Sequence, residues 1–169
     1  HDIIQSGKPV VSVNSDVPDS GRICYVGTNY LGAGKTAAGM TNFIIHSSLK
    51  ILIITGSYNI RGHKERIKGF EEGLNSHKID YTIVDTIEAE DDDDFSYSKT
   101  KDFLKTNSEI NCIFVAAAGS TGVCQAVEEL NRKDIHVIAF DEVPSIKKYI
   151  QSGLIKFTIG QEPELQGYM

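Results

Sequence analysis

Short apolar runs rich in valine and isoleucine recur along the whole chain, and amphipathic segments separate most of them. The runs read PVVSVN, RICYVG, KILIITG, DYTIVDT, CIFVAAA, HVIAFDE and IKFTIGQ. Helical periodicity marks the segments 29–47, 60–76, 97–106, 121–132 and 144–151, and Gly153 is expected to stop the last helix. Strands that alternate with helices indicate βαβ units. The predicted fold class is α/β, a mostly parallel sheet with helices on both faces.

The composition is that of an ordinary globular domain, with 169 residues, 40% of them hydrophobic and 24% charged. A net charge of -6 argues against a surface that grips nucleic acid, because counterion release needs clustered Lys and Arg. No apolar run reaches the length of a membrane span, and the first residues lack the pattern of a secretory leader. We therefore expect no membrane contact from this chain.

Three cysteines, Cys24, Cys112 and Cys124, lie in apolar or helical segments without a C-x-x-C spacing. We interpret them as buried free thiols, which favours a cytoplasmic protein. A periplasmic or extracellular location stays open, because one pair could still form a disulfide.

The stretch GTNYLGAGKT, at residues 27–36, ends like a phosphate-binding P-loop and stands between a strand-like run and a predicted helix. The spacing departs from that motif, because the position that needs the first glycine holds Asn29. The later IHVIAFDE resembles a magnesium-binding strand and keeps a nucleotide enzyme as an alternative of a different class. The preferred interpretation is a helix packed on a sheet through small residues, with Lys35 at the surface.

The loops expected after the strands carry Asn, Asp, Ser, Gln and Glu side chains. Ligands of open α/β sheets collect at the carboxyl ends of the strands, so these loops favour a polyhydroxylated or amide-rich ligand. The acidic run at 88–94 lacks the spacing of a calcium-binding loop and is interpreted as a solvated loop. His46, His63, His77 and His136 are interpreted as solvated or capping residues, and no catalytic motif occurs. The sequence predicts a binding protein, not an enzyme, without metal or cofactor.

Four blocks together resemble the type 1 periplasmic binding protein superfamily, in order and over nearly the whole chain. They are PVVSVNSDVPDSGRICYVGTNYLGAGKTAAG, GHKERIKGFEEGL, AAAGSTGVCQAVEEL and HVIAFDEVPSIKKYIQSGLIKFTIGQEPELQGY. That superfamily includes sugar-binding proteins of transporters and the effector domains of LacI-family regulators. The resemblance implies two similar lobes joined by three crossovers. It implies that residues 1–21 belong to the N-terminal lobe and first crossover, 22–153 to the C-terminal lobe, and 154–169 to a crossover back.

The resemblance also implies ligand contacts. Asn14, Asp141 and Gln161 match family positions that touch the ligand, and Phe95, in the loop after the fourth run, matches an aromatic that stacks on a sugar ring. Lys64 stands where the family commonly has Arg, and Ala117-Ala118 stand where it has Asn or Asp. The loss of a bidentate donor and of an amide argues against a simple pentose or hexose.

The leading hypothesis from the sequence is an effector-binding lobe of a LacI-type regulator with a small carbohydrate-like ligand. This reading implies a homodimer at full length and DNA contact only through a helix-turn-helix absent from this chain. The alternative is the solute-binding protein of a sugar ABC transporter.

Overall fold

The computed structural model describes residues 2–169 and divides them into two compact units. The smaller unit comprises the residues up to Asn29 together with Gln161–Met169, and the larger unit is Tyr30–Gly160. The sequence analysis places these boundaries at 21/22 and 153/154. The difference lies in two strands, because the strand in the second run pairs within the smaller unit and the strand in the seventh run pairs within the larger sheet.

The larger unit is built on five parallel strands in the order β4-β3-β5-β6-β7. The strands are β3 (Leu49–Thr55), β4 (Tyr81–Glu88), β5 (Cys112–Val115), β6 (His136–Phe140) and β7 (Ile155–Ile159). Each falls within or overlaps one of the apolar runs. The predicted α/β class with a parallel sheet is confirmed.

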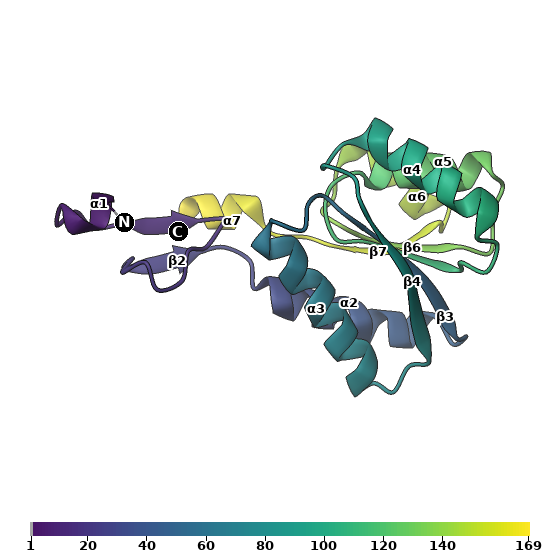
Figure 1. Cartoon of the computed structure of the whole chain (residues 1–169), viewed down its shortest axis with the longest axis horizontal. Coiled ribbons are helices and arrows are strands. Elements are labelled where there is room, and N and C mark those ends of the chain that lie inside the picture. The colour runs from purple at the N-terminus through teal and green to yellow at the C-terminus, as the bar shows by residue number, and fades with distance from the viewer. Residues whose placement is uncertain (1) are drawn as a thin grey trace. The chain divides into compact units, whose positions relative to one another are not determined.

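Helices cover both faces of this sheet, as the ribbon shows (Figure 1). One face carries α2 (Tyr30–Ile44) and α3 (Arg61–Ser76). The other carries α4 (Asp93–Thr106), α5 (Ser120–Glu129) and α6 (Lys147–Gln151), the last preceded by the 3-10 turn η1 (Pro144–Ile146). Gly153 ends the α6 segment with a left-handed φ of 77°, as predicted.

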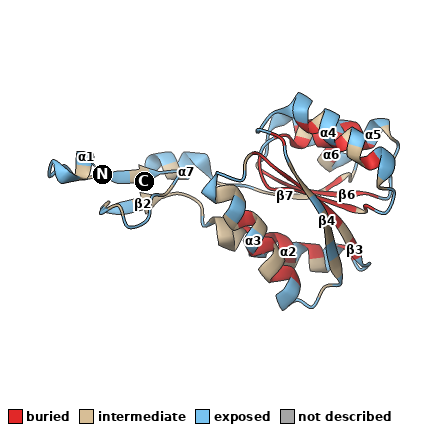
Figure 2. Ribbon diagram, in the orientation of Figure 1, coloured by how far each residue is buried: buried red, intermediate tan, exposed pale blue. Residues whose placement is uncertain are grey.

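Side-chain alternation along the strands divides the core between the two faces. Leu49, Ile51 and Ile53 of β3 pack toward α2 and α3, whereas Leu52 and Ile54 pack toward the opposite helices. This is the period of two that a strand buried on both sides imposes. The buried residues therefore concentrate in the sheet and the inner helix faces (Figure 2).

The glycines of α2 and α3 bring the two helices into backbone contact. A Cβ on Gly34 would lie 2.1 Å from the carbonyl oxygen of Arg66, and one on Gly69 would lie 2.1 Å from that of Leu31. The sequence analysis assigned the small residues of 27–36 to a helix–sheet contact. Gly34 instead serves a helix–helix contact, and Ala37 and Ala38 contribute to the core beneath it.

The acidic run at 88–94, interpreted as a solvated loop, is a loop only in part: Glu90 to Asp92 form an exposed turn, whereas Asp93 and Asp94 open a helix. Asp92 caps α4 by accepting the Phe95 N–H at 2.7 Å, and Asp93 and Asp94 occupy the first turn. Carboxylates at that position complement the free N–H groups and the helix dipole. The helix therefore begins at Asp93 rather than at 97.

The smaller unit contains α1 (Asp2–Gln5), β1 (Val11–Val13), β2 (Cys24–Val26) and α7 (Pro163–Tyr168). β1 and β2 are parallel neighbours, with Ser12 opposite Tyr25. Arg22 donates two hydrogen bonds to Asp16, at 2.5 and 2.7 Å, across the connection between the strands. The two short helices had no counterpart in the sequence prediction.

The cysteines differ from one another. Cys112 and Cys124 are buried free thiols, as predicted, and burial raises the pKa of each to about 12. Cys24 is exposed, which corrects its assignment as a buried thiol. Among residues 2–169 no helix combines the length and the apolar character needed to cross a bilayer.

Candidate ligand-binding site

The strand order of the larger unit defines one position where a ligand is expected. The chain moves from β3 outward to β4, then returns to the other side of β3 to place β5. At such a reversal the loops after the two central strands diverge, and ligands of open α/β sheets bind at that point. Here these loops follow β3 and β5, and α3 begins beside them at Arg61.

Asp91 contacts both of the loops that follow β3 and β5. Its carboxylate accepts the Ala118 N–H at 3.1 Å and lies over Gly56, where an added Cβ would come within 2.3 Å of it. Glu90 and Asp91 both have a left-handed backbone, with φ of 54° and 59°. Asp91 therefore places a carboxylate beside Ala118, close to where the family commonly has its own acid or amide.

His63 faces the same carboxylate. Its Nε2 lies 3.9 Å from Asp91 Oδ1, and its Nδ1 accepts the Ser57 N–H at 3.5 Å. Only 12% of the side chain is exposed. Burial lowers the pKa of His63, while the Asp91 charge acts to raise it and the Arg66 charge adds to the lowering. The sequence interpretation of His63 as solvated or capping was wrong, because it lies in the first turn of α3 under this loop.

Arg66 lies one turn further along α3 and is 4% exposed. Its Nη1 donates to the carbonyl of Ala116 at 2.9 Å, just after β5. Its guanidinium carbon lies 4.2 Å from the ring centre of Phe140 and 5.0 Å from that of Tyr30. Burial lowers the pKa of Arg66, and the charges of Asp141, Tyr30 and Asp91 counter this effect in that order.

Asp141 follows β6 in a left-handed conformation with φ of 64°. Its N–H donates to the Ile159 carbonyl at 2.9 Å, and its own carbonyl accepts the Thr158 hydroxyl. Both groups of the peptide are thus fixed by the neighbouring strand β7. Non-glycine residues persist in this conformation only where their surroundings hold them, and such positions cluster at functional sites.

Asn14 follows β1 in the same way within the smaller unit. Its φ is 63°, its N–H donates to the Val26 carbonyl at 3.0 Å, and its carbonyl accepts the Tyr25 hydroxyl at 2.8 Å. Asn14 and Asp141 therefore occupy equivalent places, each at the end of a strand and each fixed by the next parallel strand. Asn and Asp are the non-glycine residues that tolerate this backbone best.

Gln161 also belongs to the smaller unit. Its carbonyl accepts the side-chain amide of Gln166 at 2.6 Å, and the Thr28 hydroxyl lies 3.4 Å from its Oε1. Gln166 also donates to the Thr28 hydroxyl at 3.2 Å. Thr28, Gln161 and Gln166 thus form one polar cluster around the start of α7.

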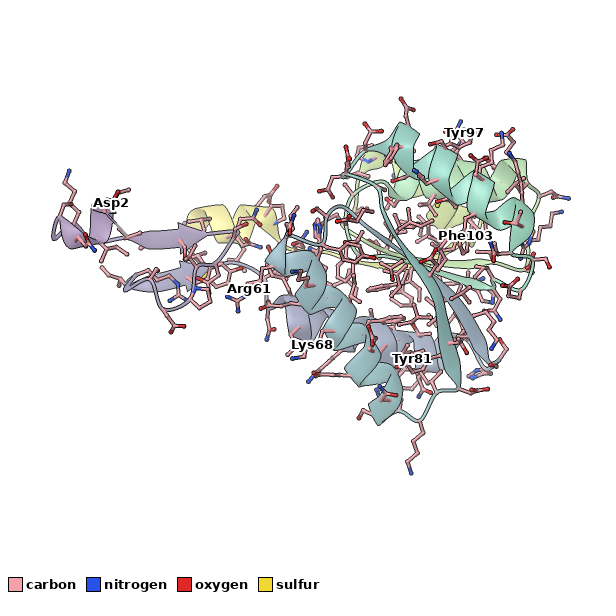
Figure 3. All side chains as sticks on the ribbon, viewed as in Figure 1. Asp2, Arg61, Lys68, Tyr81, Tyr97 and Phe103 are labelled. Carbon is pink, nitrogen blue, oxygen red and sulfur yellow. The ribbon has the colours of Figure 1, made fainter. Side chains whose placement is uncertain are left out.

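Lys64 and Phe95 are the two remaining predicted contacts. Lys64 is exposed on α3, and within residues 2–169 its ammonium has no ion pair or hydrogen bond. Phe95 lies in the first turn of α4 rather than in a loop, is 37% exposed, and has the Lys99 ammonium 5.0 Å from its ring centre. The outer faces of these helices are polar, as the labelled Arg61, Lys68 and Tyr97 illustrate (Figure 3).

The predicted contacts are thus divided between the two units. The larger unit contains Lys64, Phe95 and Asp141, and the smaller unit contains Asn14 and Gln161. Sequence reasoning missed Arg66, His63 and Asp91. A signal existed for Arg66, since it stands on the apolar face of α3 four residues before Phe70. Nothing in the sequence indicated that Asp91 would reach Ala118.

The geometry of α2 contradicts the nucleotide-binding alternative. Gly34 is buried against α3 and lies within the helix, not at its N-terminus, where a P-loop would present free N–H groups. Lys35 is exposed, as predicted, and pairs with Glu72 at 2.9 Å. No group of three or more acidic, His or Cys side chains in the described part of the chain is arranged to hold a metal ion.

A parallel α/β sheet with polar side chains at the carboxyl ends of its strands is typical of ligand-binding domains. The family model described as "Periplasmic binding protein domain" matches residues 1–169. The chain belongs to this family, within the type 1 periplasmic binding protein superfamily.

The sequence is similar to those of several named binding proteins. The chain is 22% identical to the ribose import binding protein RbsB of Haemophilus influenzae over 160 residues, which are 94% of this chain and 54% of that protein. It is also 22% identical to the xylose/arabinose-binding protein XylF of Sulfolobus acidocaldarius, covering 99% of this chain and 45% of that protein. The chain thus spans about half the length of these curated relatives.

Solved structures agree closely with the fold. The XylFII molecule is 34% identical with a TM-score of 0.92, covering 99% of this chain and 62% of its own. GanP, a glucose-galactose binding protein from Geobacillus stearothermophilus, is 31% identical with a TM-score of 0.92, covering 99% and 60%. These names favour the solute-binding alternative over the LacI-type regulator that the sequence analysis placed first. They lend no support to the DNA contact and homodimer implied by the regulator.

Proposed function

We propose that this chain is part of a sugar-binding protein that serves an import system, and that it binds a small sugar or sugar-like polyol without chemical conversion. The observation that carries the proposal is Asp141 at the end of β6, whose backbone N–H and carbonyl are both hydrogen-bonded to β7 and so fix where its carboxylate begins. A fixed carboxylate is suited to accept two hydrogen bonds from neighbouring hydroxyl groups.

Asn14, Lys64, Phe95 and Gln161 remain proposed ligand contacts with Asp141. They provide an amide, a cation, an aromatic face and a second amide, the groups with which proteins bind polyhydroxylated molecules. Asp91 adds a carboxylate beside Ala118. We also propose a periplasmic or extracellular location in place of the cytoplasm, since the named relatives include import binding proteins.

A second candidate function is sugar sensing through a partner protein. A solved XylFII-LytSN complex contains a chain 32% identical to this one, with a TM-score of 0.92. The binding chemistry would be the same, and only the partner that responds to the ligand would differ. Coprecipitation from the native host, with and without sugar, separates a transporter from a sensor.

The test is calorimetry of the full-length protein that carries this chain against ribose, xylose, arabinose, glucose, galactose and simple polyols. We expect one of them to bind. Asp141→Ala should then weaken its Kd by about 10- to 150-fold, or about 1.5 to 3 kcal/mol, because ligand hydroxyls lose a charged partner. The control is Asp102→Ala on α4, whose side chain is 75% exposed. Equal affinity in the parent and in Asp141→Ala would contradict the proposed site.

A further inference from the structure

Asp91 has a strained backbone that its loop holds in place. Asp91 and Glu90 are successive non-glycine residues in the left-handed region, with φ of 59° and 54°, and such residues persist only where their surroundings hold them. The Ala89 N–H donates to the Thr55 carbonyl at 2.7 Å. The Glu90 N–H donates to the Gly56 carbonyl at 2.9 Å. The loop after β4 is thus fixed on the end of β3, and Asp91 stands beside it.

Gly56 leaves open the space that the Asp91 carboxylate occupies. A Cβ on Gly56 would lie 2.3 to 2.4 Å from all three atoms of the Asp91 carboxyl group, which is closer than real Cβ atoms approach. The backbone of Gly56 does not itself require glycine, because its φ is not in the left-handed region. Glycine at this position therefore serves the carboxylate and not the turn.

The Asp91 carboxylate is fixed through one oxygen and open at the other. Its Oδ1 accepts the Ala118 N–H at 3.1 Å and lies 3.9 Å from His63 Nε2. Within residues 2–169 its Oδ2 accepts no hydrogen bond, and 39% of the side chain is exposed. A carboxylate oxygen is an acceptor only, so the open Oδ2 is suited to a ligand hydroxyl.

Thr55 adds a second polar group at the same strand end. It is 1% exposed, and in the described part of the chain its hydroxyl has no hydrogen-bond partner. The alternation along β3 directs it toward α2 and α3, the side to which Ile53 also points. A buried hydroxyl without a partner costs free energy. The stability of the sheet therefore accounts neither for this hydroxyl nor for the strained position of Asp91.

We propose that Asp91 is a specificity-determining contact of the binding site, which accepts a hydrogen bond from one ligand hydroxyl through Oδ2, and that Gly56 is required to keep the carboxylate there. This inference rests on the proposed function and deepens it, because it assigns to one residue the discrimination between a sugar and a deoxy analogue. A site built to bond with a hydroxyl rejects the analogue that lacks it. The ligand class is a sugar or polyol with a hydroxyl directed at the ends of β3 and β5.

The experiment measures Kd in the full-length protein for whichever of the five named sugars binds the parent, and for each monodeoxy form of that sugar. The deoxy penalty is the ratio of the Kd of the deoxy form to that of the sugar. One penalty of at least about tenfold in the parent should fall below about threefold in Asp91→Ala, while the other penalties stay. Asp94→Ala is the matched control, because it removes the same charge from an exposed side chain in the first turn of α4. Penalties that are the same in Asp91→Ala and in the parent overturn the proposal.

Gly56→Ala tests the placement of the carboxylate without removing a polar group. The added methyl meets the far end of a flexible side chain, so the carboxylate moves away at little cost to the fold. We expect Gly56→Ala to weaken the Kd at least about tenfold and to reduce the same deoxy penalty. In the Asp91→Ala background it should change the Kd by less than about threefold. Equal losses in both backgrounds overturn the proposal.

Proton NMR of the His63 ring, assigned with His63→Gln, separates this inference from the proposed function. The Asp91 charge acts to raise the pKa of His63, so Asp91→Ala and Gly56→Ala should both lower that pKa further. A parent that binds none of the sugars contradicts the proposed function, whereas a sugar that binds with unchanged deoxy penalties contradicts only this inference. An equal pKa of His63 in the parent and in Gly56→Ala shows that glycine does not place the carboxylate, and also overturns the proposal.

Discussion

Single residues beside the strand ends have a left-handed backbone or bury a titratable side chain. Asn14 and Asp141 occupy left-handed positions, and His63 is enclosed beside Asp91. Each of these features costs free energy by itself, and each is held by hydrogen bonds from an adjacent strand or loop. Asn14 and Asp141 follow strands and His63 lies in the first turn of α3, so all three features lie outside the strands of the sheet.

His63 gives this arrangement a pH dependence. Burial lowers its pKa below the ordinary value of 6.5, so the unfolded chain takes up the proton first as the pH falls. The stability that neutral His63 contributes is present above pH 6.5 and is lost as the pH falls through its lowered pKa. We expect the free energy of unfolding in urea to fall between about pH 7.5 and 5.5, and to fall less in His63→Gln.

His136 supplies the comparison for that measurement. Burial lowers its pKa as well, so we expect it to contribute to the pH dependence that remains in the His63 variant. In a double variant, His63→Gln with His136→Gln, the free energy of unfolding should change less with pH than in either single variant. An unchanged slope in His63→Gln would show that the imidazole is already solvated in the folded protein.

The helices α2 and α3 depend on glycine at their contact. Gly34 and Gly69 leave no space for a methyl group, because each faces a backbone carbonyl of the other helix. The contact between the two backbones contains no side chain that could change its rotamer. The helix pair is therefore closely packed without large residues between the two helices. The two helices thus position the first turn of α3, which carries His63 and Lys64.

Gly34→Ala should lower the free energy of unfolding by about 1 to 3 kcal/mol, because a Cβ 2.1 Å from the Arg66 carbonyl forces the helices apart. The control is Gly39→Ala in the same helix, where a Cβ meets only His77 Nε2 at 3.5 Å. That change should stabilise by about 0.5 to 1 kcal/mol through helix propensity. Denaturant unfolding measures both, and a loss of the same size in both would contradict the close contact.

The strands were predictable from the sequence because a strand buried on both faces is a continuous apolar run, such as KILIITG. The contact of Gly34 with α3 was not, because it depends on which two helices become neighbours. The sequence of Asp92 to Asp94 was ambiguous, because an acidic run is typical of both a solvated loop and the start of a helix. The proposed ligand contacts Asn14 and Asp141 came from family resemblance, and their left-handed backbone emerged only from the structure.

The molecule as a whole consists of units that differ in how much apolar surface they bury. The sheet of the larger unit is covered on both faces, and Leu52 and Phe114 are fully buried. The smaller unit has two short strands in which Val11 and Val13 remain 49% and 58% exposed. A two-stranded sheet is marginally stable without further packing.

Hydrogen exchange of this chain should therefore separate the units. Amides of β3 and β5 should exchange only through global unfolding, and those of β1 and β2 at least about 100-fold faster through local opening. Mass spectrometry of peptides covering 9–26 and 49–56 measures the difference. Equal protection of both would mean that the smaller unit is stabilised by packing beyond its own strands.

The unequal burial of the three cysteines gives the protein a ready-made attachment point for a reporter dye. Cys112 and Cys124 have pKa values of about 12 and no access to solvent, so a maleimide should leave them intact in the folded state. Cys24 stands exposed on β2, the strand whose Tyr25 and Val26 hold Asn14. One fluorophore on this chain, attached there without any mutation, would place an optical probe next to a proposed ligand contact in a chain that contains no tryptophan.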